Sequence, residues 1–163
     1  MIEHPIPPVY DEHSRVLILG SFPSVKSREM GFFYGHPQNR FWKVLSAIFC
    51  EEVPISVEER RDFLLRNRIA VWDVIGSCDI VGSSDSSIKN VVVNDLSVIL
   101  EAADIRQMFV NGKTAARMFD KYIKPQIKRS AFCLPSTSPA NAAWSFERLT
   151  ESWRVVGDFC SFI

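Results

Sequence analysis

The residues with the clearest chemical potential lie in the segment Gly35-His36-Pro37-Gln38-Asn39-Arg40-Phe41-Trp42. A turn containing proline places the amide side chain of Asn39 directly before an apolar run with helical spacing. An asparagine at this place can cap the helix, or its amide can hold a water molecule. Because Pro37 suits the first helical position, we expect the cap at His36 and a free Asn39 side chain.

Two further loops are rich in small residues and in residues with a fixed φ. Gly20-Ser21-Phe22-Pro23-Ser24 follows a short apolar stretch at 16–19. Leu134-Pro135-Ser136-Thr137-Ser138-Pro139-Ala140-Asn141 follows another at 131–134. Such stretches predict buried strands, and open α/β sheets keep their ligand sites at the carboxyl ends of strands. We therefore expect these loops to converge at one edge of a sheet.

Strands and helices are expected to alternate along the chain, which implies a parallel sheet covered by helices on both faces. The predicted strands span 15–19, 69–75, 107–110 and 131–134. The predicted helices span 39–49, 56–67 with a capping box at Ser56-Val57-Glu58-Glu59, 94–103 capped at Asn94-Asp95, 112–123 ended by Pro125, and about 142–159. Loops are predicted at 20–38 and 76–87.

The three loop segments resemble motifs of the uracil-DNA glycosylase superfamily, and most closely those of its hypoxanthine-DNA glycosylase branch. GSFPS corresponds to the first motif, FYGHPQNRFW to the segment with the catalytic asparagine, and LPSTSPAN to the second motif, which grips the DNA minor groove. The resemblance spans most of the chain. It implies a three-layer α/β/α fold with a four-stranded parallel sheet in the order 2-1-3-4, in one domain formed by residues 1–163.

Comparison with the other branches singles out one catalytic candidate. The mismatch-specific uracil/thymine branch shares an HPxNRFW segment but carries its asparagine in an N-P-G turn, where this chain has Phe22-Pro23-Ser24. The aspartate of the G-Q-D-P-Y turn in the most familiar uracil branch is also missing. Asn39 is the remaining candidate. The second motif usually holds a histidine, whereas this chain has Ser136 or Thr137 there.

The resemblance implies a base pocket around these loops. The Asn39 amide oxygen would orient a water against C1′ while the N-glycosidic bond breaks through an oxocarbenium-like state. Tyr34 would stack on the flipped base and Phe22 would line the pocket, although both could be plain core residues. His36 could donate to the leaving base or a phosphate, or serve only the helix start. Asp73 could accept the N1–H of hypoxanthine, which adenine lacks, or form a cap or salt bridge.

Small polar and basic residues near the loops are candidates for DNA contact. The formal net charge is zero, with 19 basic and 19 acidic residues, so we expect a local patch rather than a basic protein. The predicted DNA-binding residues are Ser21, Ser24, Lys26, Arg40, Ser136, Thr137, Ser138, Pro139 and Asn141. An ordinary strand-to-helix turn and solvated surface charges are the alternatives.

Composition excludes several other classes. No basic leader with an apolar core opens the chain, and no run of about 18 apolar residues could span a membrane, so we expect a cytoplasmic protein. The cysteines at 50, 78, 133 and 160 are widely spaced without neighbouring histidines, which argues against a disulfide framework, a metal site or an iron–sulfur cluster. We expect a monomer without cofactor.

The expected function is therefore that of a monofunctional DNA glycosylase in base excision repair, acting on DNA that contains a deaminated base, preferentially hypoxanthine. Ser24 stands where G-Q-D-P-Y has its tyrosine, so the pocket is expected to admit larger bases than uracil. One alternative is a uracil or G:U/G:T mismatch-specific glycosylase. An alternative from another class is a non-catalytic module that binds lesions or nucleotides.

Overall fold

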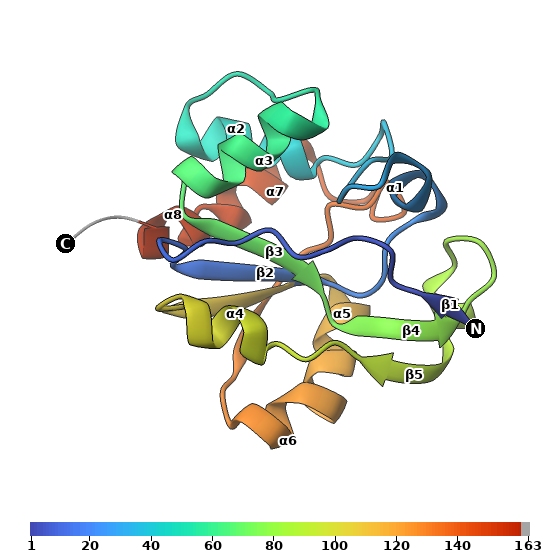
Figure 1. Ribbon diagram of the computed structural model, residues 1–163. Coiled ribbons are helices and arrows are strands. Elements are labelled where there is room, and N and C mark those ends of the chain that lie inside the picture. The colour runs from blue at the N-terminus through green and yellow to red at the C-terminus, as the bar shows by residue number, and fades with distance from the viewer. Residues whose placement is uncertain (161–163) are drawn as a thin grey trace.

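A four-stranded parallel sheet forms the centre of the protein, for which a computed structural model describes residues 1–160 (Figure 1). The strands are β2 (Val16–Gly20), β3 (Ile69–Asp73), β6 (Gln107–Asn111) and β7 (Ala131–Leu134). They pair in the order β3-β2-β6-β7, which confirms the expected order 2-1-3-4 and the α/β/α class. The register sets Gly20 beside Asp73 at the carboxyl edge of the sheet.

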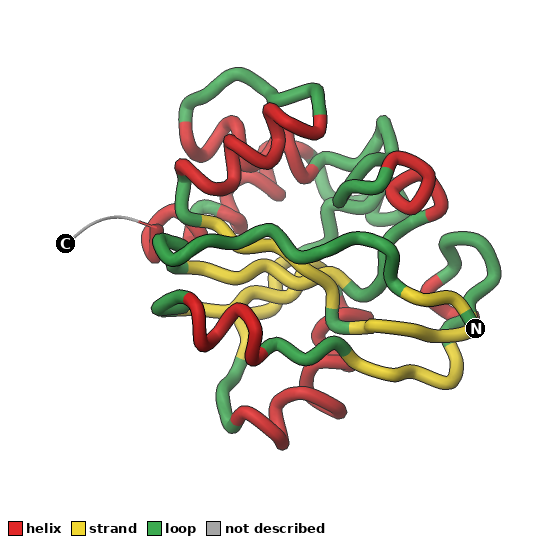
Figure 2. The backbone as a smooth tube through the Cα atoms, in the orientation of Figure 1, coloured by secondary structure: helices red, strands yellow, loops and turns green. Residues whose placement is uncertain are grey.

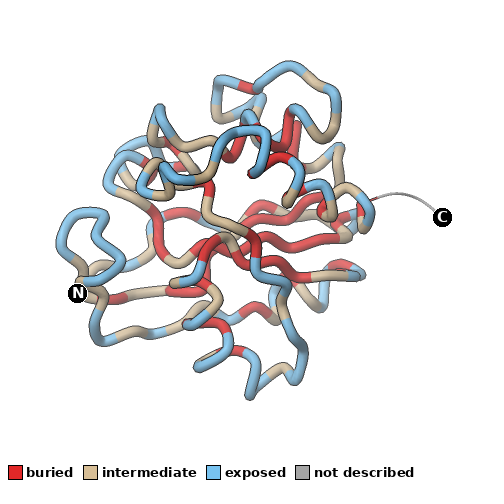
Figure 3. Tube along the Cα trace, turned by 180° about the vertical axis from the view of Figure 1, so that it is seen from behind, coloured by how far each residue is buried: buried red, intermediate tan, exposed pale blue. Residues whose placement is uncertain are grey.

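Side chains alternate between two cores, one on each face of the sheet. Val16 and Ile18 of β2 are fully buried against one group of helices, and Leu17 and Leu19 are fully buried against the other. The first group is α2 (Phe41–Phe49), α3 (Val57–Arg66), α7 (Phe146–Trp153) and α8 (Val155–Cys160), and the second is α4 (Ser97–Ala102), α5 (Lys113–Met118) and α6 (Lys124–Ile127) (Figure 1). Buried residues accordingly concentrate along the sheet (Figure 3).

A second, antiparallel sheet in the order β1-β4-β5 continues from the end of β3 (Figure 2). Its strands are β1 (Ile2–Glu3), β4 (Ile75–Asp79) and β5 (Lys89–Val93). The prediction of one strand over 69–75 was therefore wrong, because β3 ends at Asp73 and β4 begins two residues later. The prediction of a loop over 76–87 was also wrong in part. Here β4 pairs with β1 from the N-terminus and with β5, the next strand in the chain, and the sequence of 76–79 shows no strand alternation.

Helix ends account for the remaining differences. The predicted loop 20–38 contains a short helix, α1 (Val25–Met30). The helix predicted over 39–49 begins at Phe41, because Asn39 N–H donates to the His36 carbonyl in a separate turn and Arg40 N–H donates to the Thr137 carbonyl. Pro37 is thus outside the helix, and the expected cap at His36 was wrong.

The other caps follow local chemistry. The Ser56 side chain accepts from Glu59 N–H at 3.0 Å, which confirms the predicted capping of α3. Pro125 does not end a helix as predicted, because a π-helical turn at Phe119–Ile123 leads into α6 and the proline lies in the first turn of α6. The last predicted helix is divided into α7 and α8, and α7 starts only after its cap at Ser145. Within residues 1–160, no helix has the length and apolar character needed to cross a membrane.

Candidate active site

A cavity of about 400 Å³ opens at the carboxyl ends of the parallel strands. Three of its lining residues, Gly20, Asp73 and Asn111, are the last residues of β2, β3 and β6. The volume lies within the range of ~300–1,000 Å³ that is typical of small-molecule sites. The other lining residues come from the first loop and α1, the 33–39 loop, the β4–β5 connection and the 136–140 loop.

The cavity brings together most of the site residues predicted from sequence. It is lined by Asn39, by the predicted base-binding residues Phe22, Tyr34, His36 and Asp73, and by Ser21, Ser24, Ser136, Thr137, Ser138 and Pro139 from the predicted DNA-binding set. Lys26, Arg40 and Asn141 do not line it. The loops therefore converge at one sheet edge, as expected, and the roles of the individual residues stay predictions.

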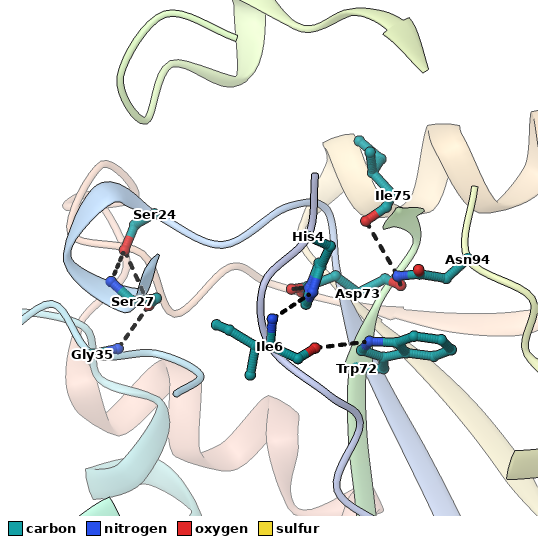
Figure 4. Close-up of polar contacts among 9 residues, drawn as sticks. All are labelled: His4, Ile6, Ser24, Ser27, Gly35, Trp72, Asp73, Ile75 and Asn94. Atoms are coloured by element: carbon teal, nitrogen blue, oxygen red, sulfur yellow. Dashed lines mark hydrogen bonds and ion pairs between the residues drawn. The ribbon is translucent and has the colours of Figure 1, made fainter. Parts of the chain in front are cut away.

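The 20–24 loop and the 33–39 loop are joined through Ser24, the N-cap of α1, and Ser27 within α1 (Figure 4). Ser24 caps α1, since its side chain accepts from Ser27 N–H at 3.1 Å. The Ser27 hydroxyl is buried and accepts from Gly35 N–H at 2.9 Å. These bonds fix the backbone at Gly35, within the segment that carries Tyr34 and Asn39.

Asn39 lies at the cavity and also stabilises the start of α2. Its Oδ1 accepts from Phe41 N–H at 3.0 Å. This bond supports the alternative that Asn39 caps the helix. Asn39 itself lies one residue before the N-cap residue, Arg40, and its side chain bonds to the first residue of α2. A carbonyl oxygen has two acceptor positions, so Oδ1 can accept from a water while it holds Phe41.

His36 presents one ring nitrogen for donation. Its Nδ1 accepts from Gln38 N–H at 3.1 Å. A neutral ring in this tautomer carries its proton on Nε2. His36 can therefore donate a hydrogen bond from Nε2 while Nδ1 supports the turn.

Tyr34 is held in a constrained position. Its φ of 53° lies in the left-handed region, and its ring stacks on Phe41 with 3.9 Å between centroids and 16° between planes. One face of the ring is therefore covered, and a flipped base would have to use the other. The hydroxyl is buried and makes no hydrogen bond of normal geometry within residues 1–160, although the Asn111 side chain lies near enough to favour its ionised form. Burial, followed by the nearby Asp73 carboxylate, raises the pKa of Tyr34 well above its usual value.

Asp73 forms a buried pair with a residue that the sequence did not single out. His4 Nε2 lies 2.7 Å from Asp73 Oδ2, and the two side chains are 3% and 5% exposed. The Asp73 backbone carbonyl accepts from Asn94 Nδ2 at 2.9 Å (Figure 4). The cap or salt-bridge alternative for Asp73 was thus partly right, because the partner is histidine.

The 136–141 loop is held by a two-way amide contact. Asn111 Nδ2 donates to Thr137 Oγ1 at 3.0 Å, and Thr137 N–H donates to Asn111 Oδ1 at 3.1 Å. Thr137 is fully buried, so in this structure it supports the loop. Arg40 also supports it, since its guanidinium donates to the carbonyls of Asn141 and Trp144.

The β4–β5 connection forms the outer wall of the cavity. Ser83 Oγ accepts from Val25 N–H at 2.9 Å, and Arg28 Nη2 donates to the Gly82 carbonyl at 2.6 Å. Ser21 Oγ lies 3.3 Å from Asp85 Oδ1. Desolvation raises the pKa of the Asp85 carboxyl above its ordinary value. These three contacts therefore hold the β4–β5 connection against the 20–24 loop and α1.

The charges at the cavity are acidic. Asp73 and Asp85 line it, whereas none of the described lining residues is lysine or arginine. Lys26 lies on α1, 60% exposed, with its Nζ 3.8 Å from Glu29 Oε2. The described lining therefore carries carboxylates, and Lys26 lies outside it.

An open parallel α/β sheet with a ligand-sized cavity at its carboxyl edge defines the class of doubly covered α/β domains that bind ligands at strand ends. The sequence profile of the "Uracil DNA glycosylase superfamily" matches residues 7–159. The chain belongs to the uracil DNA glycosylase superfamily, as the resemblance of its loops predicted.

Relatives of known name and structure agree with this assignment. A "Hypoxanthine DNA glycosylase" of Methanosarcina acetivorans is 34% identical over 161 residues, covering 96% of this chain and 98% of the relative. A protein of the same name from Methanosarcina barkeri is 38% identical over 109 residues, covering 66% and 69%. The solution NMR structure of a candidate uracil DNA glycosylase from Methanosarcina acetivorans superimposes with a TM-score of 0.83 at 32% identity, covering 98% of this chain and 99% of that one.

Sequence reasoning missed His4, Asn111 and Asp85. For Asn111 a signal was present, because the polar last residue of a predicted strand belongs at the same sheet edge as the other loops. For His4 and Asp85 no local pattern was available, since β1 brings His4 to Asp73 behind the cavity lining and Asp85 reaches the cavity in the connection between β4 and β5.

Proposed function

We propose that this protein removes a deaminated base from DNA by hydrolysis of the N-glycosidic bond, with hypoxanthine as the preferred base. Asn39 is the catalytic residue, and Phe22, Tyr34, His36 and Asp73 receive the extruded base. The proposal joins the family, the names of the relatives and the chemistry of the cavity.

The observation that carries the proposal is the presence of the Asn39 amide and the Asp73 carboxylate at one cavity, whose lining within residues 1–160 contains no lysine or arginine. Positive charge develops on the sugar when an N-glycosidic bond breaks through an oxocarbenium-like state. Fixed acceptors and carboxylates stabilise such a charge, and a cationic lining would oppose it. The charge distribution therefore suits this bond cleavage.

The absence of a lining lysine also supports a hydrolytic step without a covalent intermediate, because Schiff-base formation needs a reactive amine. Asn39 Oδ1 holds and orients the attacking water, and its neutral amide is a weak base. Most of the driving force then comes from departure of the base, helped by stacking on Tyr34 and hydrogen bonds to its edge.

Asp73 supplies the reading of the base. A carboxylate accepts the N1–H of hypoxanthine, whereas adenine presents an acceptor at that position. Adenine would leave a buried acceptor unpaired, which costs about 1–3 kcal/mol. The names of the two Methanosarcina relatives support hypoxanthine as the substrate.

A uracil or mismatch-specific glycosylase is the second candidate function. Uracil also presents a ring N–H to a carboxylate, and the structural relative is named as a candidate uracil DNA glycosylase. A non-catalytic lesion-binding module is the alternative of another class.

A glycosylase assay separates the three. Duplexes with a single inosine, uracil or G:T mismatch are incubated with native protein and with Asn39→Ala, and strand breaks are scored after alkali. We expect the native protein to cleave at inosine and the Asn39→Ala variant not to do so. Binding without release of any base would instead support the non-catalytic module.

The DNA contacts extend the proposal outward. The proposed contacts within the cavity lining are Ser21, Ser24, Ser136, Thr137, Ser138 and Pro139. Those outside the lining are Lys26, Arg40 and Asn141. A single domain, a monomeric state, function without metal or cofactor, and a cytoplasmic location complete the proposal.

A further inference from the structure

We propose that His4 is a positioning residue for base recognition, which holds Asp73 as a hydrogen-bond acceptor toward the cavity. The inference rests on the proposed function, because it takes Asp73 to read a ring N–H of the excised base. It adds a residue from the N-terminal segment to the recognition machinery.

The hydrogen bonds of His4 fix its tautomer. Its Nδ1 accepts from Ile6 N–H at 3.2 Å, so Nδ1 carries no proton. The proton of the neutral ring is then on Nε2, which lies 2.7 Å from Asp73 Oδ2. Asp73 therefore accepts through Oδ2, and Figure 4 shows the two side chains next to each other.

The other Asp73 oxygen is placed at the cavity by the absence of a side chain at Gly20. A Cβ at Gly20 would lie 2.5 Å from Asp73 Oδ1 and 3.2 Å from the Tyr34 hydroxyl. Glycine at the end of β2 thus leaves room for two polar groups from different elements. With Oδ2 occupied by His4, Oδ1 is the acceptor that remains for a base.

His4 is itself held rigidly. Its backbone N–H donates to the Gly76 carbonyl at 2.8 Å beside the β1–β4 pairing. Its ring packs edge-on to Phe22 and Trp72, with 5.8 and 6.4 Å between centroids. A donor fixed in an apolar surround strengthens one hydrogen bond and excludes water from it.

The consequence for the substrate is discrimination. A buried carboxylate oxygen that loses its donor is left unpaired, so the side chain is no longer held in one orientation. A rotated Asp73 would no longer present Oδ1 to select against the acceptor at N1 of adenine. His4 therefore contributes both to the rate on inosine and to the refusal of adenine.

The test compares His4→Phe, which keeps an aromatic ring without a donor, with His4→Gln, whose amide can donate from nearly the Nε2 position. Single-turnover excision of inosine should fall about 10- to 100-fold in His4→Phe, the effect of an unpaired buried acceptor. His4→Gln should recover most of the rate. The ratio of inosine to adenine excision should fall in His4→Phe and return in His4→Gln.

Trp72→Phe is the matched control. It removes the bond from Trp72 Nε1 to the Ile6 carbonyl, 3.3 Å long, and so loosens the same segment, while an aromatic ring stays beside His4 and the Nε2 donor of His4 is kept. We expect near-native excision and discrimination. In an Asp73→Ala background, where no acceptor remains for His4, His4→Phe should add little to the loss, because both changes remove the same contact.

Two results would overturn the inference. One is a folded His4→Phe variant with native rate and discrimination, and the other is a full additional loss from His4→Phe in the Asp73→Ala background. An imidazole ¹⁵N spectrum of the free protein checks the contact without any substrate and should show His4 protonated on Nε2 alone. Failure of the native protein to excise inosine would refute the proposed function, whereas protonation of His4 on Nδ1 would refute the positioning role.

Discussion

The two sheets of this protein differ in burial and in how they serve the site. In the parallel sheet every residue of β2 is buried, and its neighbours β3 and β6 are almost as well covered. In the antiparallel sheet β5 has no buried residue. The parallel sheet supplies the ends that carry Gly20, Asp73 and Asn111, and the antiparallel sheet supplies His4 and the outer wall. A rigid scaffold thus places the polar groups, and an added sheet orients and covers them.

Asp73 lies at the junction of these regions, since β3 ends there and β4 begins at Ile75. Its backbone belongs to the parallel sheet, and its side chain is bonded to the N-terminal segment. Variants on either side of this junction should therefore separate chemistry from support.

The largest effect is expected from Asn39→Ala, on the parallel-sheet side. Loss of the water-orienting amide should lower single-turnover excision about 100-fold or more. The lost bond to Phe41 N–H should cost about 0.5–2 kcal/mol of unfolding free energy, measured by urea titration. Asn39→Asp keeps a capping oxygen and serves as the stability control. If Asn39→Ala cleaves at the native rate per folded molecule, the capping role is the whole role.

Substitution of Tyr34 should have the second largest effect on excision. Tyr34→Ala removes a stacking surface, which contributes about 1–3 kcal/mol per base, so excision should fall about 5- to 150-fold. Tyr34→Phe should have a small effect on rate, because the buried hydroxyl makes no hydrogen bond of normal geometry within residues 1–160. Both variants are measured in the same excision assay. Equal losses would transfer the role from the ring to the hydroxyl.

A pair of glycine variants compares the two regions directly. Gly20→Ala sets a Cβ 2.5 Å from Asp73 Oδ1 and must displace that carboxylate, so inosine excision should fall about tenfold. Gly82→Ala in the β4–β5 connection meets no atom within 4 Å, and its φ of 59° implies only about 1–2 kcal/mol of strain. We expect a small loss of stability there with nearly native excision. A greater loss of activity at Gly82 would reverse the assignment of the two regions.

The smallest effect is expected for Lys26→Glu on α1. Lys26 is exposed and outside the cavity, so reversal of its charge should weaken binding to lesion and plain duplex alike and reduce the salt slope by about 1. The excision rate at saturating protein should not change. Lys124→Glu on α6, on the other side of the sheet (Figure 1), is the charge-matched control. Equal effects of the two would place the DNA on another face.

The sequence was sufficient for the parallel sheet because each of its strands is a short apolar run of its own. Ile69 to Val71 and Met108 to Val110 can be recognised without their partners, and the helix that precedes Ile69 carries a local cap at Ser56. The antiparallel sheet has no such signal. β1 is two residues long, and β4 contains Gly76 and Ser77, so its strand character depends on pairing with β1 and β5.

The same distinction applies to the site. Loop motifs indicated Asn39, Tyr34 and the 136–140 loop because those residues lie within a contiguous pattern. His4 is 69 positions from Asp73 in the sequence, and only the folded chain brings them together. For Arg40 the sequence pattern predicted a DNA contact but not a structural role. The structure shows that its guanidinium donates to the carbonyls of Asn141 and Trp144.

The most direct test of the account is the relative rate on inosine and uracil. Single-turnover rates of the native protein are compared on duplexes that are identical except for one inosine, uracil, xanthine or adenine. The account predicts that inosine is removed faster than uracil and that adenine is not removed, because a cavity of about 400 Å³ with Asp73 as acceptor fits a purine with an N1–H. Faster removal of uracil than of inosine would contradict the assignment of hypoxanthine and establish the uracil alternative.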